Sequence, residues 1–375
     1  MKKLGIYLHI PFCGSKCHYC DFCSFPNQSK STMQAYCDAM RTQMERYAPL
    51  ASDCEVDTVY FGGGTPTALP QEMLCSLLAW VKQQFRVSKH AEITAECNPA
   101  TANAAYFAAM RQAGFNRLSI GAQSMHDSEL RLLGRAHTVG DFCETVSLAR
   151  AVGFANISAD LMYGIPDQTR ASLGASVERL CALGVEHISA YGLKIEEGTP
   201  FYQKRNSLNL PDDDEVAAMY EDTVSALAAH GLMRYEISNF ARAGYESRHN
   251  LKYWECDDYL GFGVAAYSCF GDRRFGISRD FAAYLDTRDV LEEDAVITPA
   301  ERMTEYVMLG MRLEKGIDKA TFAARFGCTF DEVYASRLAP YIKSGFVLDD
   351  EQACRFTTAG FLVSNAILAE VLDFA

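Results

Sequence analysis

Three cysteines near the N-terminus have the spacing of iron–sulfur ligands. Cys13, Cys17 and Cys20 form a C-x3-C-x2-C pattern, and Cys23 follows three residues later. Three thiolates at this spacing can hold three irons of a [4Fe–4S] cluster and leave the fourth iron without a protein ligand. An open iron is a place where a small molecule can bind and react. The spacing therefore predicts a cofactor before any fold has been argued.

Two other interpretations of these cysteines stay open at this point. A zinc site would need a fourth ligand, and Cys23 or His18 could supply it. The thiols could also be ordinary buried side chains. Pro11 and Gly14 favour a loop, which can wrap around a cluster as a strand cannot. We favour the cluster, and we expect Cys23 to be a spare thiol packed near it.

Further polar or flexible residues recur where apolar runs of the sequence end. Each of them could be a solvated loop residue or part of a structural ion pair, and the glycines could simply form a tight turn. Charged groups at the ends of apolar strands are costly to bury without a partner. A zwitterionic ligand with a ribose would give each a role, because carboxylates and amides suit hydroxyls and a guanidinium suits a carboxylate. These residues are Gly63, Gly64, Thr65, Glu96, Gln123, Arg135 and Asp160.

The elements that must position these residues alternate between strands and helices. Parallel strands with helical crossovers form either an open doubly wound sheet or a closed or partial barrel. In both, chemistry gathers at the carboxyl ends of the strands. The expected strands are Leu4–Ile10, Val56–Phe61, Glu92–Glu96, Arg117–Ile120, Asn156–Met162 and His187–Tyr191. The expected helices are Ser31–Ala48, Gln71–Phe85, Ala102–Ala113, Asp141–Ala151 and Arg170–Leu183.

This rhythm changes after about residue 205, which suggests three parts. Residues 1–205 are expected to form the strand–helix domain, 206–297 an extension, and 298–375 a small, mostly helical C-terminal domain. The tail should contain a helix at Phe330–Gly345, a strand at Phe346–Leu348 and a helix at Phe356–Ala369.

Composition limits the class of protein. The 375 residues are 49% hydrophobic and carry a net charge of −13, which argues against a nucleic acid as the main partner. No apolar run is long enough for a membrane helix, and the basic N-terminus lacks the apolar region of a secretory signal. We therefore expect a cytoplasmic protein whose 14 cysteines are mostly reduced. Nothing in the sequence argues for peripheral membrane contact.

Taken together, the motifs resemble the radical S-adenosylmethionine (SAM) superfamily, in the branch of the oxygen-independent coproporphyrinogen oxidases and their relatives. The resemblance covers nearly the whole chain and implies a partial (βα)6 TIM-like barrel. It also implies a [4Fe–4S] cluster on Cys13, Cys17 and Cys20, with SAM on the free iron. The motifs are Tyr7-Leu-His-Ile-Pro-Phe-Cys13, the cysteine triplet, Gly-Gly-Gly-Thr-Pro, Glu-Cys-Asn-Pro, Gly-Ala-Gln-Ser and Asp-Leu-Met-Tyr-Gly-Ile-Pro. By motif match, the SAM site would comprise Tyr7, Gly63, Gly64, Thr65, Glu96, Gln123, Arg135 and Asp160.

Within this branch the sequence is closer to the HemW heme-chaperone family than to the oxidases. The oxidases carry a long segment before the cluster motif and a further cysteine two residues after the third. Here twelve residues precede Cys13, and Phe22 occupies the position of that further cysteine. The segment His249-Asn-Leu-Lys-Tyr253-Trp254 matches the family's H-N-x-x-Y-W motif. The resemblance thus implies a protein that binds heme and transfers it to an acceptor protein, with a cellular electron donor as a further partner and no catalytic residue assigned.

The implied heme contacts are His249, Tyr253, Trp254 and Tyr267. Imidazole is a good axial ligand for heme iron, and the aromatic rings offer flat faces to a porphyrin. A histidine beside aromatic residues is more often a packed core residue, so the assignment depends on the family match. Tyr267 stands where these relatives usually have a histidine. The alternative function is a radical SAM enzyme that acts on a porphyrin, by oxidative decarboxylation or by reductive ring opening.

Overall fold

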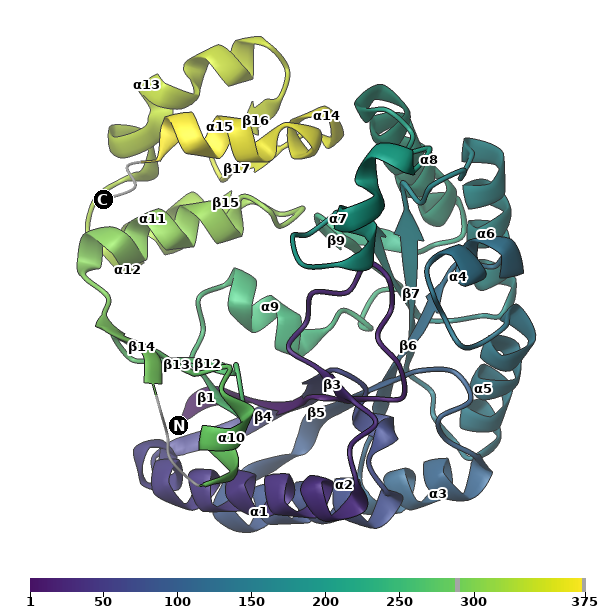
Figure 1. The fold of residues 1–375 in the computed structure, drawn as a ribbon. Helices are drawn as coiled ribbons and strands as arrows, with labels where there is room; N and C mark the ends of the chain where they lie inside the picture. The colour runs from purple at the N-terminus through teal and green to yellow at the C-terminus, as the bar shows by residue number, and fades with distance from the viewer. Residues whose placement is uncertain (287–290, 373–375) are drawn as a thin grey trace.

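One sheet of twelve strands organises the chain (Figure 1). The computed structural model describes residues 1–286 and 291–372. Six strands in the middle of the sheet are adjacent and parallel, and their order in space follows their order in the sequence. They are β1 (Lys2–Ile10), β4 (Cys54–Gly63), β5 (Val87–Cys97), β6 (Arg117–Gln123), β7 (Ile157–Tyr163) and β8 (His187–Gly192). Five of them include the predicted strands in full, and β7 begins one residue after the predicted start at Asn156.

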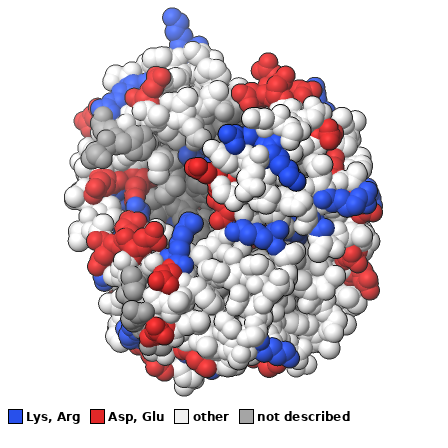
Figure 2. All heavy atoms as spheres, viewed as in Figure 1, with Lys and Arg blue, Asp and Glu red and all other residues white. Residues whose placement is uncertain are grey.

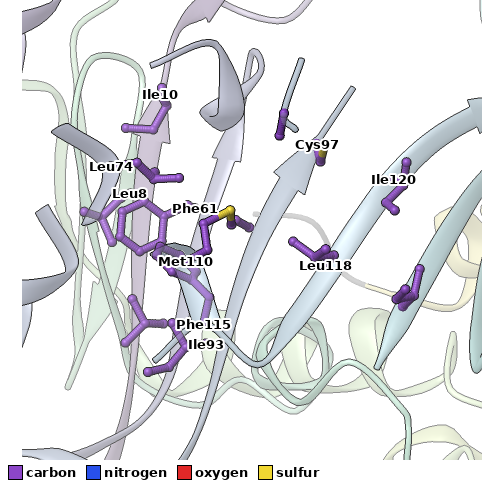
Figure 3. Close-up of a cluster of buried hydrophobic side chains, with 14 of the residues drawn as sticks. Leu8, Ile10, Phe61, Leu74, Ile93, Cys97, Met110, Phe115, Leu118 and Ile120 are labelled. Atoms are coloured by element: carbon purple, nitrogen blue, oxygen red, sulfur yellow. The ribbon is translucent and has the colours of Figure 1, made fainter. Parts of the chain in front are cut away.

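Helices cover the outer face of these six strands (Figure 1). Apolar side chains fill the space between the two layers, and Figure 3 shows Leu8, Phe61 and Leu118 from three strands within that core. Side chains alternate between the two faces along β1, and the outward ones, Leu4, Ile6, Leu8 and Ile10, are apolar and have no solvent exposure. The helices of this part of the chain are α1 (Lys30–Tyr47), α2 (Gln71–Gln84), α3 (Ala104–Ala113), α4 (Asp127–Leu132), α5 (Val139–Ala151), α6 (Arg170–Ala182), α7 (Pro200–Lys204) and α8 (Asp213–Ala229). Of these, α4 and α7 lie at the carboxyl ends of the strands, where backbone hydrogen bonds join Leu133 and Phe201 to His18 of the cysteine loop. Three short 3-10 turns lie at Ala48–Ala51, Pro66–Ala68 and Arg205–Ser207.

Short strands extend the sheet on both edges. Beside β1 lie β11 (Tyr259–Phe262), β12 (Tyr267–Phe270), β13 (Arg273–Ile277) and β14 (Leu291–Val296). Beside β8 lie β10 (Asn239–Ala241) and β9 (Met233–Glu236). The sheet therefore ends at β14 and β9, which do not pair with each other. This open arrangement confirms the partial barrel. Two further strands, β2 (Phe12–Cys13) and β3 (Phe25–Pro26), pair with each other at the ends of the cysteine loop.

The inner face of the sheet is polar, in contrast to its outer face. On each of five neighbouring strands every second residue points inward, and most of these residues carry hydroxyl, carboxyl, imidazole or guanidinium groups. The inward residues include Thr58, Tyr60, Glu92, Thr94, Glu96, Arg117, Ser119, Ser158, Asp160, His187, Ser189 and Tyr191. A polar interior of this kind requires hydrogen-bond partners for each group, and it provides a lining for polar ligands.

Helix α9 (Arg248–Trp254) packs against the inner face near the amino ends of β1, β4 and β5. Glu92 accepts hydrogen bonds from the backbone N–H groups of Arg248 and His249 at 3.2 and 3.1 Å. On β1, Gly5 makes room for the helix, because a Cβ there would lie 2.9 Å from Lys252 and 3.3 Å from the His249 ring. The short helix α10 (Phe281–Leu285) lies beside α1.

The C-terminal domain is mostly helical and has its own apolar core around Phe322, Phe330 and Phe356. Its helices are α11 (Pro299–Gly310), α12 (Lys319–Phe326), α13 (Phe330–Lys343), α14 (Thr358–Leu362) and α15 (Ser364–Val371). It also holds a three-stranded sheet of β15 (Ile317–Asp318), β17 (Ala353–Phe356) and β16 (Val347–Asp349). No helix in residues 1–286 or 291–372 is long and apolar enough to cross a membrane.

Arg234 on β9 connects the barrel to this domain. Its guanidinium bonds Glu314 at 2.7 Å and Thr358 at 3.2 Å, and it stacks over the Phe361 ring at 4.3 Å. Arg234→Met should remove these contacts while keeping the buried stem, at a cost of about 2 kcal/mol in domain docking. Hydrogen exchange of α14 and limited proteolysis of the C-terminal domain should both speed up. Exchange rates equal to those of the wild-type protein would contradict this role.

Candidate cofactor site

A cavity of about 410 Å³ opens at the carboxyl ends of the parallel strands. The cysteine loop and the ends of β4 to β8 line it, as expected for an α/β sheet of this kind. Seven of the eight predicted SAM residues and all three cluster cysteines are among the lining residues. They are Gly63, Gly64, Thr65, Glu96, Gln123, Arg135, Asp160, Cys13, Cys17 and Cys20. Tyr7 is not a lining residue, since its ring stacks on Tyr60 and its hydroxyl bonds His9 at 3.1 Å.

The rim of the cavity carries both signs of charge. Lys16 and Lys194 line it together with Asp21 and Glu196. On the face drawn in Figure 2, basic and acidic side chains likewise lie together around the central hollow. The chain's net charge of −13 therefore does not make the cavity entrance uniformly negative. A ligand that carries both an ammonium and a carboxylate group meets partners of each sign.

The cysteine loop is held against the glycine-rich turn after β4. Gly64 N–H donates to the Ile10 carbonyl at 2.8 Å, and Thr65 N–H donates to the Phe12 carbonyl at the same distance. The thiol of Cys13 lies 3.6 Å from the Thr65 hydroxyl. Because a Cβ on Gly64 would lie 2.8 Å from the Phe12 carbonyl oxygen, only glycine fits where the two segments meet. The turn thus fixes the first cysteine.

The three cysteines fit a cluster better than a single metal ion. All three are half-buried free thiols on one cavity, and Arg135 donates to the Cys17 sulfur at 3.5 Å. In the described part of the chain, no three His, Cys, Asp or Glu side chains lie close enough together to hold one metal ion. A zinc ion needs four such ligands within about 2.3 Å, whereas thiolates on different irons of a cluster stand further apart. Burial raises the pKa of the Cys20 thiol to about 11, and iron binding would counter that by stabilising the thiolate.

Cys23 lies apart from the three cavity cysteines. It is half-buried but does not line the cavity, and its carbonyl accepts a hydrogen bond from His9 Nε2 at 2.9 Å. This placement supports a spare thiol beside the cluster loop.

Two half-buried carboxylates, Glu96 on β5 and Asp160 on β7, face the same cavity. Glu96 accepts hydrogen bonds from the Tyr60 hydroxyl at 2.9 Å and from Gly63 N–H at 3.0 Å. Asp160 accepts one from Ser119 at 3.0 Å. Burial first, and then the negative charge of Asp160, raise the pKa of Glu96 to about 7, and burial also raises the pKa of Asp160. The remaining lone pairs of both groups suit the hydroxyl or ammonium donors of a ligand.

Arg135 and Gln123 are the last two predicted SAM residues, and protein contacts or backbone conformation restrict the orientation of each. One Arg135 nitrogen donates to Asn98 at 2.6 Å and to the Gly121 carbonyl at 3.2 Å, and the other donates to Cys17. A ligand carboxylate would therefore have to share this guanidinium with protein partners. Gln123 lies in the left-handed region with φ 63°, which turns its side chain at the end of β6 into the cavity.

Several lining residues were not predicted. Asn98 donates to Thr65 at 2.7 Å and accepts from Arg135, so it joins two predicted residues. It follows Glu96 by two positions and could have been found from that spacing. Ser119, Met162 and Tyr191 also line the cavity, and the period-2 alternation of β6, β7 and β8 would have pointed to them.

The predicted heme contacts lie away from this cavity. His249 is 1% exposed, and its two ring nitrogens lie 2.9 Å from the Thr58 hydroxyl and 2.8 Å from the Tyr253 hydroxyl. Burial first, then the charges of Lys252 and Arg117, lowers its pKa to about 3, so the ring is neutral. Trp254 is half-buried, and Tyr267 on β12 is 41% exposed. The structure thus places His249 and Tyr253 together and Tyr267 on a separate strand.

The comparisons with known proteins agree with this geometry. The model of the Radical SAM superfamily matches residues 7–180, and that of the HemN C-terminal domain matches residues 297–363. The Heme chaperone HemW of Bacillus subtilis is 36% identical over 98% of each chain, and that of Escherichia coli is 32% identical over 98% of each chain. The chain belongs to the HemW family.

A solved structure supports the fold of this HemW-family protein. Coproporphyrinogen III oxidase (HemN) from Escherichia coli, a radical SAM enzyme, superimposes with a TM-score of 0.87. The match covers 100% of this chain and 91% of that chain at 24% identity, which is a likeness of fold. Membership of the radical SAM superfamily makes a [4Fe–4S] cluster and SAM the cofactors of this chain.

Removal of single cysteines tests the ligand assignment. Cys17→Ala should abolish the cluster after anaerobic reconstitution, because the thiolate is an iron ligand. Cys23→Ala is the matched control. It should keep the iron content and the charge-transfer absorption of an iron–sulfur centre at about 400 nm. Iron loss in the Cys23 variant would overturn the three-ligand assignment.

Proposed function

We propose that this protein is a heme chaperone, which binds heme and passes it to an acceptor protein. The support is the full-length match to proteins named Heme chaperone HemW in distant bacteria, at 36% and 32% identity. We place the protein in the cytoplasm, where its 14 free thiols and an oxygen-sensitive cluster are compatible with a reducing environment. The proposed partners are heme, an acceptor protein and a cellular electron donor.

The proposed cluster ligands are Cys13, Cys17 and Cys20, and the proposed SAM contacts come from the cavity described above. When bound, the reduced cluster supplies an electron to the SAM sulfonium. The chain's own residues orient the ligand: Glu96 and Asp160 accept from its hydroxyl and ammonium groups. Gly63 and Gly64 allow the backbone to approach it closely. Tyr7 acts indirectly, through its stacking on Tyr60, which donates to Glu96.

The proposed heme segment is α9 with Tyr267. A neutral imidazole offers a lone pair to iron, and the low pKa of His249 keeps the ring neutral. In the structure Tyr253 occupies Nε2 and Thr58 occupies Nδ1. Ligation by His249 therefore requires that Tyr253 release Nε2 and that α9 move away from the inner face of the sheet. Trp254 and Tyr267 are the more accessible aromatic faces.

The second candidate function is a radical SAM enzyme that acts on a porphyrin. One finding favours it, which is that the model of the Radical SAM superfamily matches residues 7–180, the part of the chain that carries the cysteines and most of the cavity lining. The two functions differ in whether SAM cleavage depends on a tetrapyrrole.

Anaerobic reconstitution distinguishes them. The cluster-loaded protein is mixed with SAM, dithionite and either heme or coproporphyrinogen, and both 5′-deoxyadenosine and the tetrapyrrole are followed by chromatography. For a chaperone we expect a stable Soret band and an unmodified tetrapyrrole. Substrate-dependent 5′-deoxyadenosine together with a modified tetrapyrrole would establish the enzyme instead.

Two α9 variants test the proposed heme ligand. His249→Ala should remove the Soret band of the ligated heme, because the axial nitrogen is lost. Tyr253→Phe should speed heme association about tenfold, since it removes one hydrogen bond that competes for Nε2, worth about 1.4 kcal/mol. Stopped-flow absorption measures both. Unchanged spectra in His249→Ala would assign the iron ligand to another residue, with Tyr267→Phe as the next variant.

A further inference from the structure

Arg117 is a buried cation that the proposed function does not yet use. It lies on β6, and 2% of it is exposed. Its Nε atom has no hydrogen-bond partner among the residues that the structure describes, nor has the hydroxyl of Thr94, the residue directly opposite on β5. A guanidinium stays charged at all physiological pH values, so its burial with an unsatisfied Nε atom is costly unless nearby negative charge compensates. Its retention inside the sheet calls for an electrostatic role.

The position of Arg117 places it directly beneath the two cavity carboxylates. On β6, Arg117 and Ser119 point inward as consecutive residues of one face. Ser119 pairs with Glu96 of β5 in the sheet register, and its hydroxyl donates to Asp160 of β7 at 3.0 Å. Arg117 thus lies one inward position below the point where Glu96 and Asp160 converge.

Among the groups around these carboxylates, Arg117 is one of two cations that favour their ionised forms. After burial, the negative charge of Asp160 is the next cause that raises the pKa of Glu96, and both effects favour the neutral acid. Arg117 lowers the pKa of Glu96 and of Asp160, and Arg135 also lowers that of Asp160. The other groups that face them are phenols whose pKa values burial raises, so they stay neutral. These are Tyr7 from β1, Tyr60 from β4, Tyr191 from β8 and Tyr253 from α9.

We propose that Arg117 is a positioning residue for SAM, whose buried positive charge holds Glu96 and Asp160 as carboxylates facing the cavity. The inference rests on the proposed SAM site. Ionised carboxylates accept hydrogen bonds from the ribose hydroxyls and attract the cationic amino acid and sulfonium groups of the ligand. A protonated acid would lose one acceptor site and the attraction. Arg117 acts through these acids and does not itself touch SAM.

Arg117→Met is the direct test. SAM affinity is measured by calorimetry on the cluster-loaded protein from about pH 6 to about pH 9, a range that brackets a group with a pKa near 7. Affinity should rise with pH as Glu96 ionises. Without the cation the pKa of Glu96 rises further, so the midpoint should move up by about one pH unit and affinity at neutral pH should fall about fivefold. Affinity should recover at the alkaline end. Arg117→Lys keeps the charge and should keep the wild-type midpoint.

The outcomes separate this inference from the site on which it rests. A uniform affinity loss at every pH in Arg117→Met, or an unchanged midpoint, would overturn the electrostatic role. If Arg117→Met does not fold, Arg117→Lys decides, because an upward shift in its midpoint would show that shape and not charge matters. If the wild-type protein binds SAM and Glu96→Gln binds it with the same affinity, the SAM site itself is contradicted. Infrared titration of the Glu96 carboxyl band, assigned with Glu96→Gln, reads the same protonation without the cofactors.

Discussion

The placement of two carboxylates inside one sheet is the constraint on which the site depends. Glu96 and Asp160 are half-buried on β5 and β7 and face one cavity, burial raises the pKa of both, and the charge of Asp160 makes ionisation of Glu96 less favourable still. Hydrogen bonds from Tyr60, Gly63 N–H and Ser119 offset part of that cost. Strand geometry supplies these donors, since each is an inward residue or a backbone group at a strand end. The polar side chains beside Glu96 and Asp160 are therefore the donors that these two acids require.

The same constraint explains why the apolar core lies outside the sheet. The outward residues of the strands pack against α1, α2, α3, α5 and α6, and that layer supplies the hydrophobic stabilisation (Figure 3). The inner face does not need to contribute apolar burial. It can hold groups that are individually costly, provided that each finds a partner. Glu92 illustrates this, since it accepts from two backbone N–H groups of α9.

Much of the fold and of the cavity could be predicted from the sequence because local patterns encode them. The six strand positions followed from short apolar or β-branched runs, and the cavity residues followed from their places at strand ends. The edge strands could not be predicted in this way, since β9 and β10 have four and three residues and pair only through tertiary contact. The surroundings of His249 were also beyond the sequence. Its partner Thr58 is 191 residues distant, and no local signal links the two.

The two proposed ligand regions are connected by direct contacts through the barrel. Tyr60 donates to Glu96 in the cofactor cavity, and its ring stacks on His249 with centroids 5.2 Å apart. His249 in turn bonds Tyr253, whose ring packs edge-on against Tyr259 of β11. If α9 moves to expose His249, Tyr60 keeps its stacking contact with Tyr7 but loses the one with His249, while it holds Glu96. The contacts that bury the proposed heme ligand are thus the ones that orient an acid of the SAM site, and neither site can rearrange without altering the packing of the other.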